Sequence, residues 1–118
     1  MKNFVVFFEI PAADFQRAVA FYTAVFGLEL AVVDCGTEKM ACFPGNVGAI
    51  SWAEGLKPGS GGVLVSLRVD DMERALTAVA AHGGRVTHPK TKIEADGMGY
   101  FANIIDSEGN QIGLYSDK

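Results

Sequence analysis

Apolar and polar positions follow one pattern along the first half of the chain. A run rich in Val, Ile and Phe over residues 4–10 predicts a strand. Apolar residues at three- and four-residue spacing over 15–26 predict a helix, with Asp14 at its N-cap and Gly27 after its last turn. Three further short strands are predicted over 29–33, 39–43 and 48–52. The first half therefore reads β-α-β-β-β.

The same order of patterns restarts after residues 54–62 (EGLKPGSGG), a Gly-, Pro- and Ser-rich connector. A strand is predicted over 63–69. A helix follows over 72–82, capped by Asp70 or Asp71, with Glu73 three residues after Asp70 as in a capping box. The remaining predicted strands cover 85–88, 101–105 and 111–115. Residues 90–99 show no pattern and are expected to form a mobile loop.

A shift of 57 residues superimposes the two halves, since 71 − 14 = 57 brings Asp14 onto Asp71. The same shift pairs Arg17 with Arg74 and Gly27 with Gly84. Such an internal repeat predicts an α+β fold of two βαβββ modules, whose curved sheets face each other around a cleft. We expect one domain over 1–118, with module one at about 4–53, the connector at 54–62 and module two at about 63–116.

Composition narrows the class of protein. With 118 residues, 49% of them apolar, the chain can bury one core. A net charge of −4 argues against binding to nucleic acid or to an anionic membrane surface. No apolar run approaches the length of a membrane span, so the expected compartment is the cytoplasm, and Cys35 and Cys42 are expected to be free thiols.

Three separated motifs carry a resemblance to a known family. They are Asp14-Phe15 with Ala20-Phe21-Tyr22 and Val25-Phe26-Gly27-Leu28; Val69-Asp70-Asp71 with Gly83-Gly84; and DSEGN (106–110) with Ile112 and Leu114. Together they resemble the vicinal oxygen chelate superfamily, which includes glyoxalase I, bleomycin-resistance proteins and extradiol dioxygenases. The opening FFEIP resembles a subgroup related to lactoylglutathione lyase. The resemblance covers nearly the whole chain and implies a homodimer.

The family's chemistry depends on a divalent metal, held by His or Glu side chains from the first and last strands of each half. When the family's motifs are aligned with this sequence, three of the four metal-ligand positions are occupied by Phe7, Leu64 and Gly113. The fourth position lies within residues 47–52, where no His, Asp or Glu occurs. These side chains offer no metal donor. The resemblance thus implies a cleft without a bound metal, and a divalent metal is the alternative cofactor.

Period-2 alternation from these places predicts the lining of the cleft. Glu9 is the candidate catalytic base, although an ion pair between Glu9 and Arg68 is about equally expected. For Trp52, a role as a lid over the pocket and a position in a subunit interface are equally expected. The complete set of predicted ligand-binding residues is Phe7, Glu9, Trp52, Leu64, Ser66, Arg68, Phe101, Asn103, Gly113 and Tyr115. His88 is expected at the surface.

Three functional hypotheses follow. The first is a metal-free, glyoxalase/bleomycin-resistance-like protein that binds or modestly transforms a small organic molecule. The second is a metal-dependent lyase, isomerase or dioxygenase with displaced donors such as Glu9, His88 or Asp96. The third is a non-catalytic dimer whose partner is another protein, which a large exposed apolar patch would favour.

Overall fold

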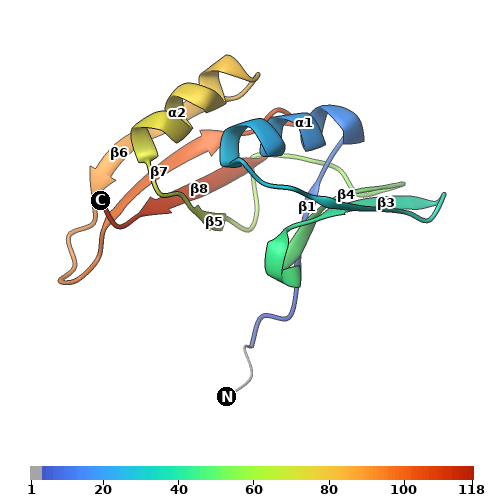
Figure 1. The fold of residues 1–118 in the computed structure, drawn as a ribbon, viewed down its shortest axis with the longest axis horizontal. Coiled ribbons are helices and arrows are strands. Elements are labelled where there is room, and N and C mark those ends of the chain that lie inside the picture. Colours follow the sequence, from blue (N-terminus) through green and yellow to red (C-terminus); the bar gives the residue numbers. More distant parts are fainter. Residues whose placement is uncertain (1–3) are drawn as a thin grey trace.

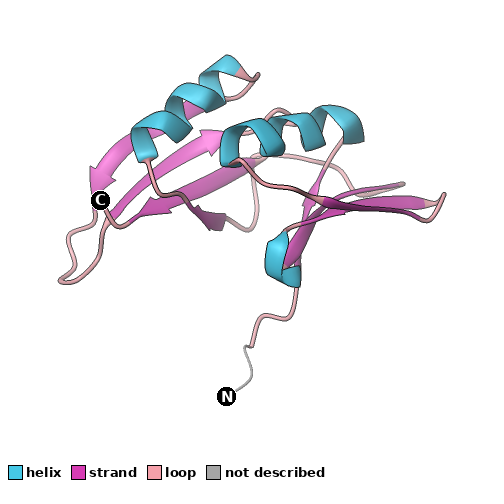
Figure 2. Cartoon of the chain, viewed as in Figure 1, coloured by secondary structure: helices cyan, strands magenta, loops and turns pink. Residues whose placement is uncertain are grey.

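A computed structural model describes residues 4–118, and the chain folds into two sheets with two helices on one side of them (Figures 1 and 2). The elements of the first module are β1 (Phe8–Pro11), α1 (Phe15–Phe26), β2 (Ala31–Asp34), β3 (Glu38–Cys42), a 3-10 turn (Pro44–Asn46) and β4 (Gly48–Ala53). Those of the second are β5 (Val65–Arg68), α2 (Met72–Ala81), β6 (Arg85–Lys92), β7 (Tyr100–Ile105) and β8 (Gln111–Ser116).

Each sheet is built from the strands of one module. The first sheet has the order β1-β4-β3-β2 and the second β5-β8-β7-β6. In both, the first strand lies parallel to the last and the other neighbours are antiparallel. The predicted α+β fold of two βαβββ modules is confirmed. None of the helices within residues 4–118 is long and apolar enough to cross a membrane.

The core lies between the sheets and the helix pair. On α1 the buried residues are Ala18, Phe21, Tyr22 and Val25, the stripe that the spacing predicts. The two helices contact each other, and α2 lies against β6 and β8 of its own sheet. Ala102 and Ile104 of β7 alternate with less buried residues, and register places Ile112 and Leu114 of β8 beside them, so these two central strands present one face to the helices.

The helix caps match their predictions, with one correction. Asp14 accepts a hydrogen bond from the Arg17 N–H at 3.1 Å, and Gly27 adopts the left-handed conformation at φ 64°. In α2 the cap is Asp71, which accepts from the Arg74 N–H. The expected capping box is not formed, because with Asp71 as the cap Glu73 is the second residue of the helix and not the third; its carboxylate accepts a hydrogen bond from Lys90 at 2.8 Å.

The prediction of a patternless loop over residues 90–99 is wrong for 90–92, because β6 continues to Lys92; residues 93–99 form the loop between β6 and β7. Two register shifts divide its pairing with β7, one on each side of His88. Pro89 is tolerated within the strand because β6 forms the outer edge of the second sheet, where a missing N–H leaves no ladder partner unsatisfied.

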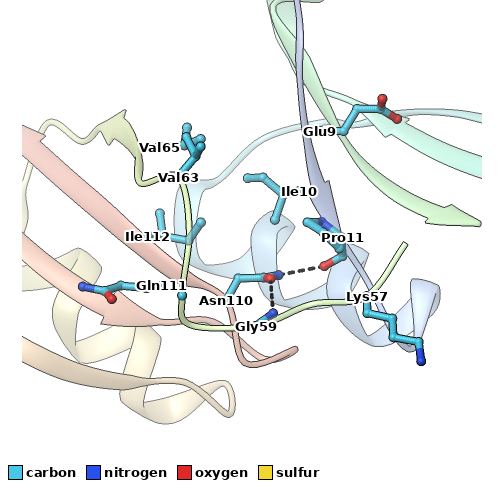
Figure 3. A pocket seen from close by; sticks show the side chains of 11 residues that line it. Glu9, Ile10, Pro11, Lys57, Gly59, Val63, Val65, Asn110, Gln111 and Ile112 are labelled. Carbon is cyan, nitrogen blue, oxygen red and sulfur yellow. Dashed lines mark hydrogen bonds between the residues drawn. The ribbon is translucent and has the colours of Figure 1, made fainter. Parts of the chain in front are cut away.

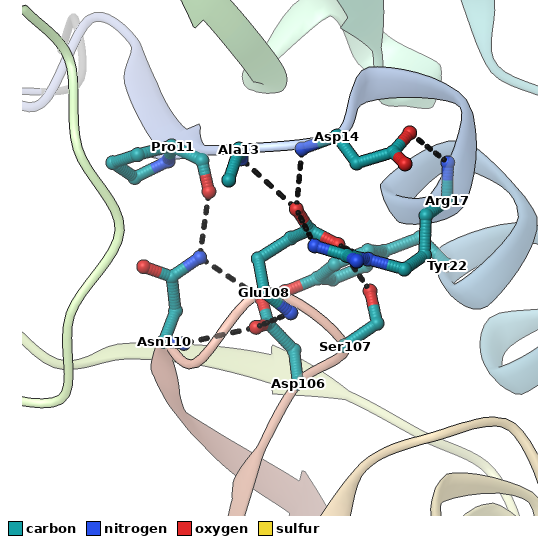
Figure 4. A network of polar contacts seen from close by, with 9 residues as sticks. All are labelled: Pro11, Ala13, Asp14, Arg17, Tyr22, Asp106, Ser107, Glu108 and Asn110. Atoms are coloured by element: carbon teal, nitrogen blue, oxygen red, sulfur yellow. Dashed lines mark hydrogen bonds and ion pairs between the residues drawn. The ribbon is translucent and has the colours of Figure 1, made fainter.

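A buried carboxylate joins the modules at the turn before β8 (Figure 4). Glu108, whose side chain is only 1% exposed, accepts hydrogen bonds from the backbone N–H groups of Ala13 and Asp14 at 2.9 and 2.8 Å. It also forms an ion pair with the Arg17 guanidinium at 2.7 Å. The start of α1 is thereby fixed to the β7–β8 turn of the other module.

Beneath Glu108, Asp106 connects the same turn to the core. Its carboxylate accepts from the buried Tyr22 hydroxyl at 2.6 Å and from the N–H groups of Glu108 and Asn110. Burial, together with the Asp106 carboxylate, raises the pKa of Tyr22 well above its ordinary value, so this hydroxyl stays protonated and donates. The sequence predicted Tyr22 in the core but gave no sign of this partner.

We predict that Glu108→Gln lowers the free energy of unfolding by roughly 2 kcal/mol at neutral pH, the scale of lost hydrogen bonds to a charged group. Removal from water raises the pKa of Glu108, but its hydrogen bonds with Arg17, the Asp14 N–H and Ser107 outweigh this and leave it lowered. The stabilisation is therefore complete above the ordinary glutamate pKa of about 4.3 and is lost as the pH falls through the lower folded value.

The measurement is urea unfolding of both proteins across this pH range, with Glu54→Gln at an exposed position as the matched control. A difference between wild type and Glu108→Gln that does not shrink in acid would contradict the ionic role of Glu108.

Candidate functional site

The second sheet has one face turned away from the helices, and we call it the open face. Strand register places two transverse rows of side chains on it. The aromatic row contains Thr91, Phe101, Tyr115 and Arg68. The polar row contains His88, Asn103, Gly113 and Ser66. Six of the ten predicted ligand-binding residues thus lie together on one surface.

Flat groups lie over the rings of the aromatic row. The Arg68 guanidinium lies 5.1 Å from the centre of the Tyr115 ring and forms an ion pair with Asp117 at 3.0 Å. The His88 ring, which projects from the polar row, stacks on Phe101 with centroids 4.9 Å apart and an interplanar angle of 13°. The Tyr115 hydroxyl accepts from the Gly99 N–H at 3.1 Å, which ties the β6–β7 loop to this face.

Gly113 occupies the middle of the polar row, but the space above it is not empty. A Cβ added at Gly113 would lie 2.6 Å from the Ser66 Oγ, so the Ser66 side chain lies over the glycine. Asn103 is Gly113's neighbour on the other side and is half-buried. A ligand that approaches this position would meet two hydrogen-bonding side chains, and Ser66 can rotate about a single torsion to make room.

The first sheet also has a face turned away from α1, and Glu9 lies on it. The Glu9 carboxylate is exposed and accepts a hydrogen bond from the buried Ser51 hydroxyl at 2.7 Å. The expected ion pair between Glu9 and Arg68 is not formed, because Arg68 pairs with Asp117. The Glu9 carboxylate is therefore exposed to water, and its partner is the Ser51 hydroxyl and not Arg68.

Three predicted residues lie apart from these faces. Trp52 stands opposite Lys39 on the helix side of the first sheet, with the Lys39 Nζ 5.4 Å from its ring. Register therefore separates it from Glu9, because Ile50, two residues before it, lies in the core while Glu9 pairs with Ala49. Phe7 and Leu64 both lie just before their strands, and Leu64 is 48% exposed.

The structure identifies the fourth place at which the family holds its metal. Gly113 pairs with Ser66, and the residue equivalent to Ser66 in module one is Glu9, since 66 − 57 = 9. Glu9 pairs with Ala49, so Ala49 is the counterpart of Gly113. The four places therefore hold Phe7, Ala49, Leu64 and Gly113, whose side chains carry no N, O or S donor, and they do not fit a metal.

Within residues 4–118, no group of three or more His, Cys, Asp or Glu side chains is arranged to hold a metal ion. Cys35 and Cys42 are free thiols, Cys35 at the exposed tip of the β2–β3 hairpin.

A small pocket of about 250 Å³ lies where the modules meet under the connector (Figure 3). Its walls include Ile10, Ile112 and Val63, and Asn110 forms its floor by accepting from the Gly59 N–H at 3.0 Å and donating to the Pro11 carbonyl at 2.7 Å. Among the predicted site residues, only Glu9 reaches it, at its margin. The sequence marked this stretch as a connector and gave no sign of a pocket.

Comparison with known proteins identifies the class to which this fold belongs. Residues 5–114 match the model of the Glyoxalase/Bleomycin resistance protein/Dioxygenase superfamily, so the chain belongs to that family. A glyoxylase-like domain-containing protein of Didymella fabae is 36% identical over 86 residues. That match covers 65% of this chain and 66% of the fungal protein, slightly less than two thirds of its length.

Solved structures share the fold at low sequence identity. A glyoxalase/bleomycin resistance protein from Albidiferax ferrireducens T118 is 18% identical, with a TM-score of 0.71 over 97% of this chain and 98% of that one. The fosfomycin resistance protein FosX from Listeria monocytogenes, solved with Mn(II) and sulfate, is 15% identical, with a TM-score of 0.71 over 100% of this chain and 93% of its own. At these identities the likeness concerns the fold alone.

Gly113→Ala tests the arrangement of the polar row. We predict a mild loss of stability, within a few degrees in melting temperature, because the obstructing Ser66 hydroxyl can rotate away. Gly99→Ala is the contrasting variant: its added Cβ would collide with the backbone carbonyl of Ser116, which cannot rotate away, so a much larger loss is expected. Thermal unfolding compares them. Equal losses would contradict the placement of Ser66 over Gly113.

Proposed function

We propose that this protein binds, and modestly transforms at most, a small organic molecule on the open face of the second sheet, without a bound metal. The observation that carries the proposal is the chemistry of the four family metal places, Phe7, Ala49, Leu64 and Gly113, none of which offers a donor. FosX has the same fold and was solved with Mn(II). This chain therefore differs from metal-binding proteins of this fold in its metal-ligand residues and not in its fold.

The side chains of the open face support a ligand of modest size. Phe101, Asn103 and Tyr115 are half-buried and combine apolar area with hydrogen-bonding groups, as small-molecule sites usually do. Ser66 and Arg68 add an exposed hydroxyl and a cation. We further propose that the protein acts in the cytoplasm, where free thiols such as Cys35 and Cys42 persist.

Metal content of the purified, untagged protein tests the metal-free proposal. After incubation with Zn²⁺, Ni²⁺, Mn²⁺ or Fe²⁺ and desalting, we expect close to zero metal per chain by inductively coupled plasma mass spectrometry, with carbonic anhydrase as the positive control. One tightly bound metal per chain would overturn the proposal and return glyoxalase and dioxygenase assays to first place.

Ligand binding is tested by a thermal-shift screen of aromatic and amphipathic metabolites. A ligand at about 100 times its Kd stabilises the native state by about 2.7 kcal/mol, which raises the melting temperature of a chain of this size by several degrees. Asn103→Leu keeps the size of the side chain but removes its hydrogen bonds, and it should abolish the shift. A library without a single stabilising compound would contradict the proposal.

We also propose a homodimer, because exposed apolar residues precede the first strand of each module. Val6 and Val63 are equivalent under the 57-residue shift and are 85% and 92% exposed, and Phe4 is fully exposed. Each precedes a strand, β1 or β5, that hydrogen-bonds on one edge only within residues 4–118. Apolar residues next to unpaired strand edges are typical of surfaces that a second chain covers.

Sedimentation equilibrium tests the dimer. We predict a dimer for the wild type and a monomer, or a dimer at least tenfold weaker, for the double variant Val6→Ser, Val63→Ser. The control is Val32→Ser, Val33→Ser, which alters two exposed valines of β2, at the far edge of the first sheet. A monomeric wild type, or equal effects of both double variants, would contradict the assignment of these segments to the interface.

A further inference from the structure

His88, which the sequence analysis placed at the surface and named as a candidate displaced metal donor, lies on the open face. It stands opposite Asn103 in the β6–β7 register and is exposed. Its ring is held parallel to Phe101 at 4.9 Å. Two register shifts on either side of it show that β6 bulges here, and bulges are often found beside functional sites, where they redirect a side chain.

The hydrogen bonds around Thr91 determine which nitrogen of His88 carries the proton. The Thr91 hydroxyl has a single proton, and it donates that proton to the Pro89 carbonyl at 2.9 Å. The same oxygen lies 3.1 Å from the His88 Nε2, so in this contact it accepts. We infer that both contacts are hydrogen bonds, in which case Nε2 is the donor and the neutral ring has its free lone pair on Nδ1. Within residues 4–118, Nδ1 has no hydrogen-bond partner.

The charged groups on this face are mainly basic. Register places Arg85 on the same face as His88, through its pairing with Ile105, and Arg68 closes the aromatic row. The acidic group paired with them is Asp117, which Arg68 contacts. The neighbouring lysines belong to the helix side: Lys90 bonds Glu73 of α2, and both Lys90 and Lys92 lie over Tyr100. Arg68 is on β5, at the opposite edge of the sheet from β6, so Arg85 is the cation on the strand of His88, and it favours an anion there although the whole chain carries −4.

We propose that the ligand of this face is a flat, weakly acidic compound whose hydroxyl or ring N–H is bound by the Nδ1 atom of His88. This inference rests on the proposed function and names the chemistry of its ligand. When the ligand ionises, the proton moves from its oxygen or nitrogen to Nδ1, and a neutral pair becomes an imidazolium and an anion. Arg85, on the same strand as His88, then stabilises the anion, and the flat His88 ring provides a stacking surface.

The tautomer is tested first, by long-range ¹H–¹⁵N NMR of the histidine rings. The chain has only two histidines, so His82→Gln assigns both, and His82 then serves as the internal control. At a pH where the rings are neutral, we expect His88 to be the Nε2–H tautomer. Thr91→Val should release this preference and Thr91→Ser should preserve it. An Nδ1–H tautomer in the wild type would overturn the proposal.

Binding is tested with 4-nitrophenol against nitrobenzene, a flat probe of similar size without an acidic hydroxyl. We expect 4-nitrophenol to shift both His88 ring nitrogens and to leave His82 unchanged, while nitrobenzene binds at least tenfold more weakly. His88→Phe should erase this difference while it retains a ring to stack on Phe101. Equal affinity for both probes, no binding of 4-nitrophenol, or binding without a change at His88 would each overturn the proposal.

These experiments distinguish failure of the binding function from failure of the weakly acidic ligand bound by His88. If compounds from the thermal-shift screen stabilise the protein through Asn103 but none perturbs His88, the assignment of a weakly acidic ligand is wrong and the binding function stands. If no compound stabilises the protein and 4-nitrophenol does not bind, both are wrong, whatever the tautomer of His88.

Discussion

A small set of side-chain hydrogen bonds at the turn before β8 joins the two modules, and the Glu108 carboxylate makes several of them. No backbone pairing joins the two sheets within residues 4–118, since each sheet is made of the strands of a single module. The modules meet instead through helix packing and through Glu108, which bonds to the beginning of α1 from the turn before β8. Because a carboxylate accepts several hydrogen bonds at once, one residue can fix both the position and the direction of that helix.

The fold could be predicted from the sequence because its local signals agree with one another. Asp14 caps α1, the apolar stripe ends at Gly27, and the 57-residue repeat specifies the second module. The alternation of the strands also placed Phe101, Asn103 and Tyr115 on one face, since period 2 is fixed by strand geometry once the register is set.

What could not be predicted depends on contacts between distant residues. The sequence gave no reason to join Tyr22 to Asp106, which are 84 residues apart. The face of the first sheet on which Trp52 lies could not be predicted, because the alignment of residues 47–52 was uncertain and a shift of one residue reverses the face. The strand character of Lys90–Lys92 was hidden by Pro89, which an edge strand tolerates. The contact between Thr91 and the His88 ring depends on a bulge that brings the two side chains together, and no local sequence pattern indicates it.

The separation of the two sheets affects how substitutions in one module act on the other. Since every ladder hydrogen bond of a sheet remains within its own repeat, substitutions on the exposed face of one copy leave the backbone pairing of the other untouched. The hydrogen bonds between the two modules depend on a few residues where the modules meet, such as Glu108 and Asp106. The two repeats thus offer two surfaces that can vary separately: one carries an exposed acid at Glu9, and the other carries Arg68, Arg85 and His88.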